Sequence, residues 1–173
     1  MHATAIGKVA YNDVLTGLYN RTAYTDKIKE IGELEKRTTT IGVVMFDVNN
    51  LKYVNDNLGH NYGDELIMAA SQVIKESFDD SVTIYRIGGD EFLGIIESDN
   101  ARQIYKLASI QFKTLMHNYN ITYHKPFHLS IAIGEAFLEK DSKEDISEII
   151  EDADKKMYAD KQEYKKTHSK VEK

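Results

Sequence analysis

Two β-rich runs on either side of Gly88 and Gly89 constrain the fold of this 173-residue chain most strongly. Paired glycines tolerate the positive φ angles of tight turns, so the pattern predicts a β-hairpin. Asp90 and Glu91 follow the glycines. A sheet would fix both carboxylates, while the missing Cβ atoms let a ligand approach the backbone. The arrangement suits a metal-bound phosphate; alternatively, it is only a solvated hairpin tip.

Hydrophobic periodicity outside the hairpin predicts the remaining elements. Residues 40–46 form a continuous apolar run, typical of a central strand covered on both faces. Residues 127–133 alternate as a half-buried strand does. Helical spacing of apolar residues recurs at 66–74, 104–115 and 146–157. The order helix, strand, helix, helix, hairpin, helix, strand, helix predicts an α/β sandwich with a mixed central sheet flanked by helices.

Composition excludes several classes of protein. Hydrophobic residues at 42% and aromatic residues at 10% exclude a disordered chain. A net charge of −6 would repel a phosphate backbone, so no nucleic-acid partner is expected. The absence of cysteine is consistent with a reducing compartment, and a cytoplasmic location is expected. No apolar run reaches the length of a membrane span, so no direct membrane contact of this domain is expected.

Motifs spaced along most of the chain resemble those of the GGDEF domain, the catalytic unit of bacterial diguanylate cyclases. The hairpin stretch 88–92 resembles the signature itself. Residues 13–21 resemble the opening loop, 46–56 the strand-to-helix metal and phosphate segment, 58–66 the stretch that follows, and 153–161 the closing helix. The fold that this resemblance implies is related to nucleotide cyclase and polymerase palm domains.

The resemblance also implies a domain organisation. Residues 1–12 would be a stub or the end of an upstream signalling helix, 13–166 the catalytic domain, and 167–173 a tail. A sensory domain in the full-length protein would pair two catalytic units. We therefore expect an excised catalytic domain with weak activity in isolation.

Three acidic side chains form the expected metal site. Asp47 ends the buried strand, where an aspartate alone is more typical of a turn. Three carboxylates placed together repel unless a cation lies between them, and hard oxygen ligands indicate Mg²⁺ or Mn²⁺. The resemblance implies two ions per GTP, bound by Asp47, the Val48 carbonyl and Asp90, with Glu91 as a further ligand or charge. Asp90 is the implied general base toward the attacking 3′-hydroxyl; alternatively, a metal acidifies this hydroxyl without a protein base.

A helix start after Val48 predicts a phosphate site, because free peptide N–H groups attract anions. The resemblance assigns the phosphates to the backbone amides of Asn50 and Leu51, with Lys52 adding a point charge. Lys161 matches the family's phosphate-binding lysine. Lys165 stands near the family's usual arginine and offers charge without a bidentate fork; alternatively, it belongs to a solvated face.

Base selection would depend on Asn55 and Asp64. An aspartate accepts both the N1–H and N2 donors of guanine, whereas adenine would leave it mispaired. Both residues match guanine-contacting positions of the family, and His60 matches a nearby substrate-contacting position. Without this resemblance, Asp64 would be interpreted as a helix cap and His60 as structural.

The implied reaction is condensation of two GTP molecules into cyclic di-GMP with loss of two pyrophosphates. Each domain would hold one GTP, so an antiparallel homodimer, which need only be transient, is required. The alternative is a catalytically silent GGDEF domain that acts as a GTP-binding or interaction module. The family's product-inhibition motif, Arg-x-x-Asp, is replaced by Asp79 and Val82 at its ends, so no feedback through that site is expected.

Overall fold

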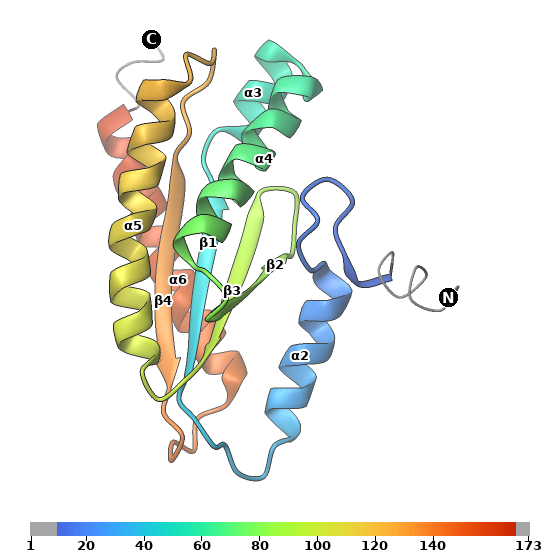
Figure 1. Cartoon of the computed structure of the whole chain (residues 1–173), viewed down its shortest axis with the longest axis vertical. Helices are drawn as coiled ribbons and strands as arrows, with labels where there is room; N and C mark the ends of the chain where they lie inside the picture. The colour runs from blue at the N-terminus through green and yellow to red at the C-terminus, as the bar shows by residue number, and fades with distance from the viewer. Residues whose placement is uncertain (1–9, 169–173) are drawn as a thin grey trace.

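The computed structural model describes residues 10–168. Residues 1–9 of the expected upstream stub and 169–173 of the expected tail lie outside this range. The helices and strands follow one another in the predicted order (Figure 1). In chain order they are α2 (Arg21–Glu33), β1 (Ile41–Val48), α3 (Leu51–Leu58), α4 (His60–Ser77), β2 (Val82–Arg86), β3 (Glu91–Glu97), α5 (Ala101–Thr122), β4 (Ile131–Leu138) and α6 (Ile146–His168).

The sheet has the strand order β2-β3-β1-β4, and each neighbouring pair is antiparallel. The α/β class with a helix-flanked central sheet is confirmed, but these four strands do not form a mixed sheet. The reason is that β3 and β4 both begin at the end where β1 finishes. Within residues 10–168, the parallel pairing is confined to an isolated bridge between Tyr19 and Tyr85.

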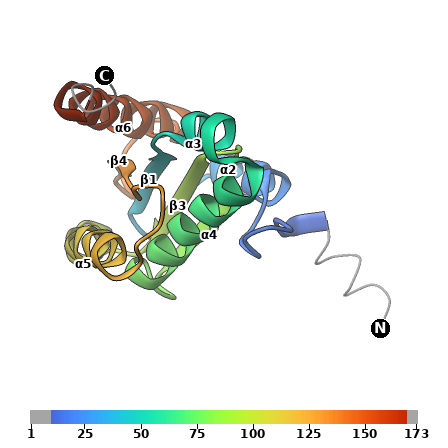
Figure 2. The same cartoon turned by 90° about the horizontal axis from the view of Figure 1, so that it is seen from above.

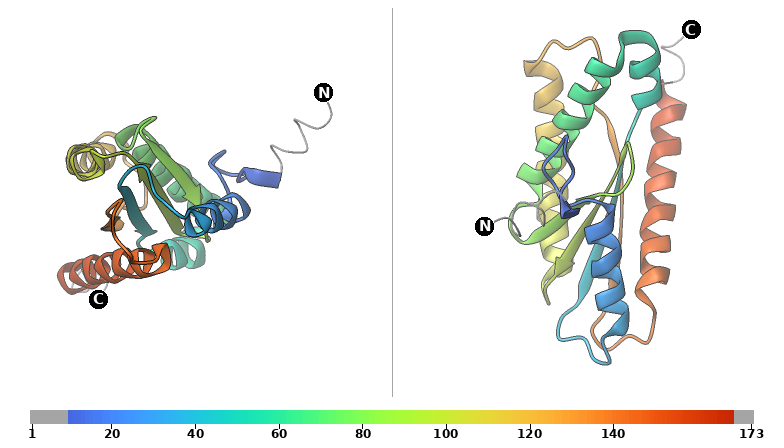
Figure 3. Two further views of the ribbon diagram at one scale, coloured as in Figure 1. Left: turned by 90° about the horizontal axis from the view of Figure 1, so that it is seen from below. Right: turned by 90° about the vertical axis from the view of Figure 1, so that its right-hand side faces the viewer.

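Helices cover both faces of the sheet: α2 and α6 lie on one side, and α4 and α5 on the other (Figures 2 and 3). All eight residues of β1 are buried, as predicted for a central strand. Because side chains alternate along a strand, Phe46 and Val48 face α4 and α5, whereas Val43 and Met45 face α6.

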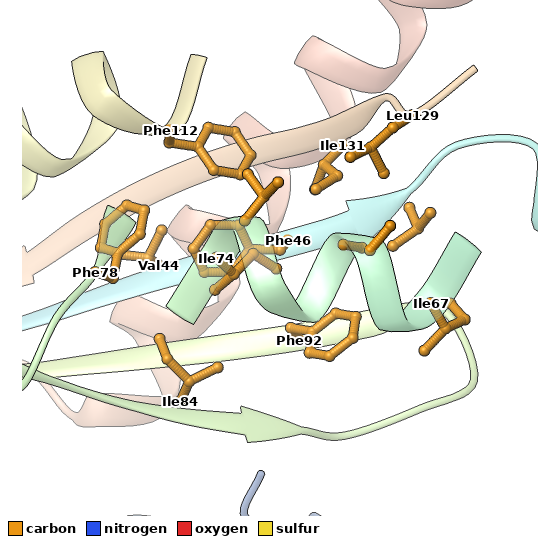
Figure 4. Close-up of a cluster of buried hydrophobic side chains, with 14 of the residues drawn as sticks. Val44, Phe46, Ile67, Ile74, Phe78, Ile84, Phe92, Phe112, Leu129 and Ile131 are labelled. Carbon is orange, nitrogen blue, oxygen red and sulfur yellow. The ribbon is translucent and has the colours of Figure 1, made fainter. Parts of the chain in front are cut away.

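Aromatic rings fill the core between the sheet and α4 and α5 (Figure 4). The ring of Phe46 lies 5.3 Å from that of Phe78 and 5.7 Å from that of Phe112. Most residues of the predicted apolar stripes therefore belong to the core or pack against it. Leu107 of α5 is 59% exposed, because the buried face of this long helix is narrow.

The last strand begins later than the alternating run 127–133 predicted. Phe127 and Leu129 are buried, but β4 starts only at Ile131. The Asn120 side chain of α5 accepts the Leu129 N–H and donates to the Leu129 carbonyl, both at 2.8 Å. A side chain thus satisfies the backbone groups that a strand partner would otherwise take. Within residues 10–168, no helix has the length and apolarity needed to cross a bilayer.

Candidate active site

Strand register places two carboxylates opposite each other on one face of the sheet. Asp47 of β1 pairs with Glu91 of β3. Their neighbours two residues along, Met45 and Leu93, belong to the core beneath α6, so both carboxylates lie on the α6 face. Like charges directly opposite across an antiparallel pair are destabilising, and such a site attracts a cation.

Close packing of α6 on β4 brings a lysine to these carboxylates. Ala132, Gly134 and Ala136 give β4 a surface of small side chains on this face. A Cβ atom on Gly134 would collide with the α6 backbone around Met157, so the glycine is needed for the approach. Farther along α6, the Lys161 Nζ lies 3.2 Å from the Asp47 Oδ2.

Burial makes Asp47 the most constrained acid of the site. Only 6% of the residue is exposed, and its Oδ1 atom is buried without a hydrogen-bond partner. Burial, followed by the charge of Asp90, raises the pKa of Asp47, while Lys161 opposes this shift. Burial also raises the pKa of Glu91, and the charges of Asp47 and Asp90 add to the effect. The carboxylates therefore stand in an electrostatic field that favours a bound cation.

Backbone hydrogen bonds hold the hairpin turn against β1. The Val48 N–H donates to the Asp90 carbonyl at 2.9 Å. The N–H and carbonyl of a strand residue point to the same side, so the Val48 carbonyl also faces the turn. Gly88 and Gly89 lie in the turn, as predicted, but neither has a positive φ. A Cβ atom on Gly88 would lie 3.1 Å from the Glu91 Oε2, so space rather than backbone angle favours glycine there.

The opening loop supports the turn from the other side. Arg86, at the end of β2, pairs with Asp13 at 3.1 Å and donates to the Gly89 carbonyl at 2.8 Å. Thr16 donates to the same Asp13 carboxylate through its N–H and its hydroxyl. The Arg21 side chain donates to the Ile87 carbonyl at 2.9 Å. Sequence reasoning gave these supporting residues no role, because the pairing spans 73 positions.

The amino-terminal end of α3 is open in the way that a phosphate site requires. Asn50 occupies the N-cap position with a left-handed φ of 66° and makes no side-chain capping bond. Its Nδ2 instead lies 3.4 Å from the Tyr164 hydroxyl of α6. The peptide N–H groups of Leu51 and Lys52 belong to the first turn, which has no intrahelical acceptors. They lie beside the carboxylates, because Asn50 follows β1 by two residues.

The remaining predicted phosphate ligands are more dispersed. The Lys52 side chain is 93% exposed and pairs with Asp56 at 3.2 Å, away from the buried carboxylates. Lys161 lies in the site, on Asp47. Lys165 is exposed, one turn beyond Lys161 on α6. The structure thus brings Lys161 together with the acids and leaves the other two lysines at the surface.

The predicted base-contacting residues lie on the α3–α4 pair. The Asn55 side chain fits against Gly63, where a Cβ atom would collide with its Oδ1. Asp64 follows Gly63 and is exposed, as is His60. Because α4 begins at His60, Asp64 lies inside the helix, and the alternative interpretation of Asp64 as a helix cap is wrong.

A divalent cation fits the oxygen set at this end of the sheet. Asp47 offers a buried, unpartnered oxygen, and Glu91 lies opposite. Within residues 10–168, no three acidic or histidine side chains are placed to hold a metal by themselves. Phosphate oxygens of a nucleotide at the start of α3 would supply the missing ligands. Sequence reasoning assigned no role to Asp154 of α6, whose charge also acts on Asp47 and Glu91.

Residues 10–167 match the family model described as "Diguanylate cyclase, GGDEF domain". The chain belongs to the GGDEF domain family. The fold agrees with solved structures of this family. One is the coiled coil and GGDEF domain of DgcB from Caulobacter crescentus in complex with c-di-GMP. It matches with a TM-score of 0.75 and 24% sequence identity, and the match covers 93% of this chain and 85% of that chain. The diguanylate cyclase SiaD from Pseudomonas aeruginosa, solved with its activator SiaC, matches with a TM-score of 0.76 and 20% identity over 94% of this chain and 62% of that chain.

Curated relatives of this GGDEF domain are longer proteins. An uncharacterized membrane protein of Staphylococcus aureus (strain USA300) is 29% identical over 151 residues. The match covers 86% of this chain and 42% of the relative. The chain thus spans less than half the length of that relative.

Proposed function

We propose that this GGDEF domain is a diguanylate cyclase, which condenses two GTP molecules into cyclic di-GMP and two pyrophosphates in bacterial signalling. The observation that carries the proposal is the pairing of Asp47 with Glu91, with Lys161 on the same face and the open start of α3 beside them. This arrangement joins a cation site to a phosphate site, as phosphoryl transfer requires.

Each residue has a proposed task in binding. The Asn50 and Leu51 amides and the Lys161 ammonium would bind the triphosphate, and Asn55 and Asp64 would contact guanine. Asp47, the Val48 carbonyl, Asp90 and Glu91 would hold Mg²⁺ or Mn²⁺. When bound, these ions would neutralise phosphate charge and acidify the 3′-hydroxyl.

The reaction would join two domains in an antiparallel homodimer. The 3′-oxygen of one GTP bonds to the α-phosphorus of the other, and the bond from that phosphorus to the bridging oxygen of pyrophosphate breaks. Asp90 would accept the 3′-hydroxyl proton. Repeating the step with the roles exchanged closes the ring. The protein's contribution is positioning and charge stabilisation.

Product analysis tests the proposal. The protein is incubated with GTP and Mg²⁺ over a range of protein concentrations, and chromatography with mass detection follows the product. We expect cyclic di-GMP whose specific rate rises with protein concentration, and none from Asp90→Asn. GTP binding without product, even after fusion to a dimerising helix, would instead favour the silent GTP-binding module.

A further inference from the structure

The ammonium group of Lys161 lies on the same Asp47 carboxylate that is the expected metal ligand. Its Nζ is 3.2 Å from the Asp47 Oδ2, and the Lys161 side chain is 24% exposed. The Asp47 side chain is only 8% exposed, so little water screens this pair. In the described structure, the lysine that matches the family's phosphate ligand therefore pairs with a carboxylate.

A buried carboxylate requires a compensating charge, and Lys161 supplies it. Asp90 and Glu91 add negative charge to the surroundings of Asp47 and strengthen this requirement. Removing one member of a buried ion pair is strongly destabilising, because the other charge is left uncompensated. Lys161 is therefore expected to stay on the charged Asp47 carboxylate until another cation replaces it.

A free divalent ion would contact the unpartnered Oδ1 atom of Asp47, while the ammonium group of Lys161 lies at Oδ2, so both cations compete for one carboxylate. Two cations on one carboxylate repel each other, and the repulsion is strong where water is scarce. Phosphates change this balance, because a lysine has three donors and a flexible stem that can turn toward a second anion. Lys161 lies on the α6 face near the start of α3, where the triphosphate is expected.

We propose that Lys161 blocks Asp47 against free divalent metal, so that the metal enters this site together with the nucleotide. The inference rests on the proposed function only in taking Asp47 as a metal ligand. Lys161 would thereby have two successive partners, first Asp47 and then phosphate.

A manganese titration without nucleotide tests the inference. Electron paramagnetic resonance measures free Mn²⁺ against the unsubstituted chain, Lys161→Met and Lys155→Met. Lys155 is a matched control on α6, exposed and paired with Glu151 at 3.2 Å. We expect Lys161→Met to bind Mn²⁺ at least tenfold more tightly, and Lys155→Met to bind as the unsubstituted chain does. Adding Asp47→Asn to Lys161→Met should abolish the gain. Equal or weaker binding by Lys161→Met, or a gain that survives Asp47→Asn, would overturn the inference.

Thermal unfolding gives a second readout. Without metal, Lys161→Met should unfold at a lower temperature than the unsubstituted chain. Mn²⁺ should raise the unfolding midpoint of Lys161→Met by more than it raises that of the unsubstituted chain. Equal Mn²⁺ shifts in both proteins would contradict the inference. Lys161→Gln keeps a hydrogen-bond donor without the charge and replaces the methionine variant if that variant fails to fold. Both readouts omit GTP, so a chain that makes no cyclic di-GMP refutes the proposed function alone, whereas unchanged Mn²⁺ affinity refutes the inference alone.

Discussion

Gly88 matters for the space it leaves beside Glu91. Its backbone has no positive φ, but a Cβ atom there would lie 3.1 Å from the Glu91 Oε2. Gly89 differs, because a Cβ atom on it would meet nothing within 4 Å. The fold therefore leaves little room for a side chain at Gly88, whereas a Cβ atom at Gly89 would lie in open space.

Alanine substitutions separate the two glycines. Gly88→Ala should lower the rate of cyclic di-GMP formation by about tenfold, because the Glu91 carboxylate must move by a few tenths of an ångström. The unfolding temperature should barely change, since the contact is with the end of a flexible side chain. Gly89→Ala is the comparison and should lose less activity, because its Cβ atom would meet no protein atom within 4 Å. Similar losses of activity in both variants would show that the turn requires glycine for its backbone freedom and not for the space beside Glu91.

Asp13 gives a prediction about pH. Burial acts to raise its pKa, but hydrogen bonds from Thr16 and Arg86 outweigh burial and lower the pKa from 3.8. A lowered folded-state pKa means that the carboxylate stabilises the fold above pH 3.8 and loses this contribution as the pH falls through the folded value.

Asp13→Asn should therefore reduce the free energy of unfolding at pH 7 by about 1–3 kcal/mol, as expected for hydrogen bonds to a charged group. The difference from the unsubstituted chain should shrink in acid, below the ordinary pKa. Urea unfolding midpoints at pH 7 and below pH 3.8 measure it. If Asp13→Asn were destabilised by the same amount at both pH values, the Asp13 carboxylate would not stabilise the fold through its charge.

The sequence predicts single site residues where local pattern and resemblance agree. Asp47 and Glu91 were expected together, and strand register shows them opposite each other. The Asp13–Arg86 pair and the Tyr164–Asn50 contact were not predicted, because each joins residues more than 70 positions apart. Such contacts depend on tertiary packing, which one sequence does not display.

At the scale of elements, the contact between β4 and α6 decides whether the site forms. Gly134→Ala would drive a Cβ atom into the α6 backbone at Ala153 and Met157. Overpacking against a rigid backbone should cost about 3 kcal/mol or more. The unfolding temperature should fall by roughly 10 °C.

Gly94→Ala in β3 is the matched control for that substitution. Its Cβ atom would lie 3.2 Å from the Ile84 and Val82 side chains, which can shift. We expect a loss of about 1 kcal/mol. Calorimetry measures the unfolding temperatures of both variants and shows which substitution destabilises the fold more. If Gly94→Ala were the more harmful, the β4–α6 approach would not be the limiting contact.

The order of elements follows from the sequence because the apolar residues form either a continuous run or a stripe with helical spacing. The all-buried β1 is an example of the first pattern and the core stripe of α4 of the second. Boundaries and strand direction do not follow. The late start of β4 depends on the Asn120 side chain, and the antiparallel order depends on where β3 and β4 enter the sheet.

At the scale of the whole molecule, acidic residues outnumber basic ones at the place of the missing product-inhibition motif. A cavity of about 640 Å³ beside β2 is lined by Glu76, Asp79 and Asp80, and among the described residues Lys75 is the one basic residue in its lining. Cyclic di-GMP carries two phosphate charges and would be repelled there. The position at which the family motif ends holds the buried Val82.

Added cyclic di-GMP should therefore leave the initial rate of the domain unchanged at concentrations well above the product formed. Calorimetric titration of the domain with the product should show no tight site. Tight product binding that is lost on substituting Asp79 would contradict this expectation.

The opening loop and the hairpin are connected through the side chain of Arg86. Asp13 forms an ion pair with Arg86, and Arg86 donates a hydrogen bond to the carbonyl of Gly89, one residue before Asp90. These two contacts connect the backbone near Asp13 directly to the acidic turn, outside the hydrophobic core. A displacement of the opening loop would therefore be expected to shift the turn that carries Asp90.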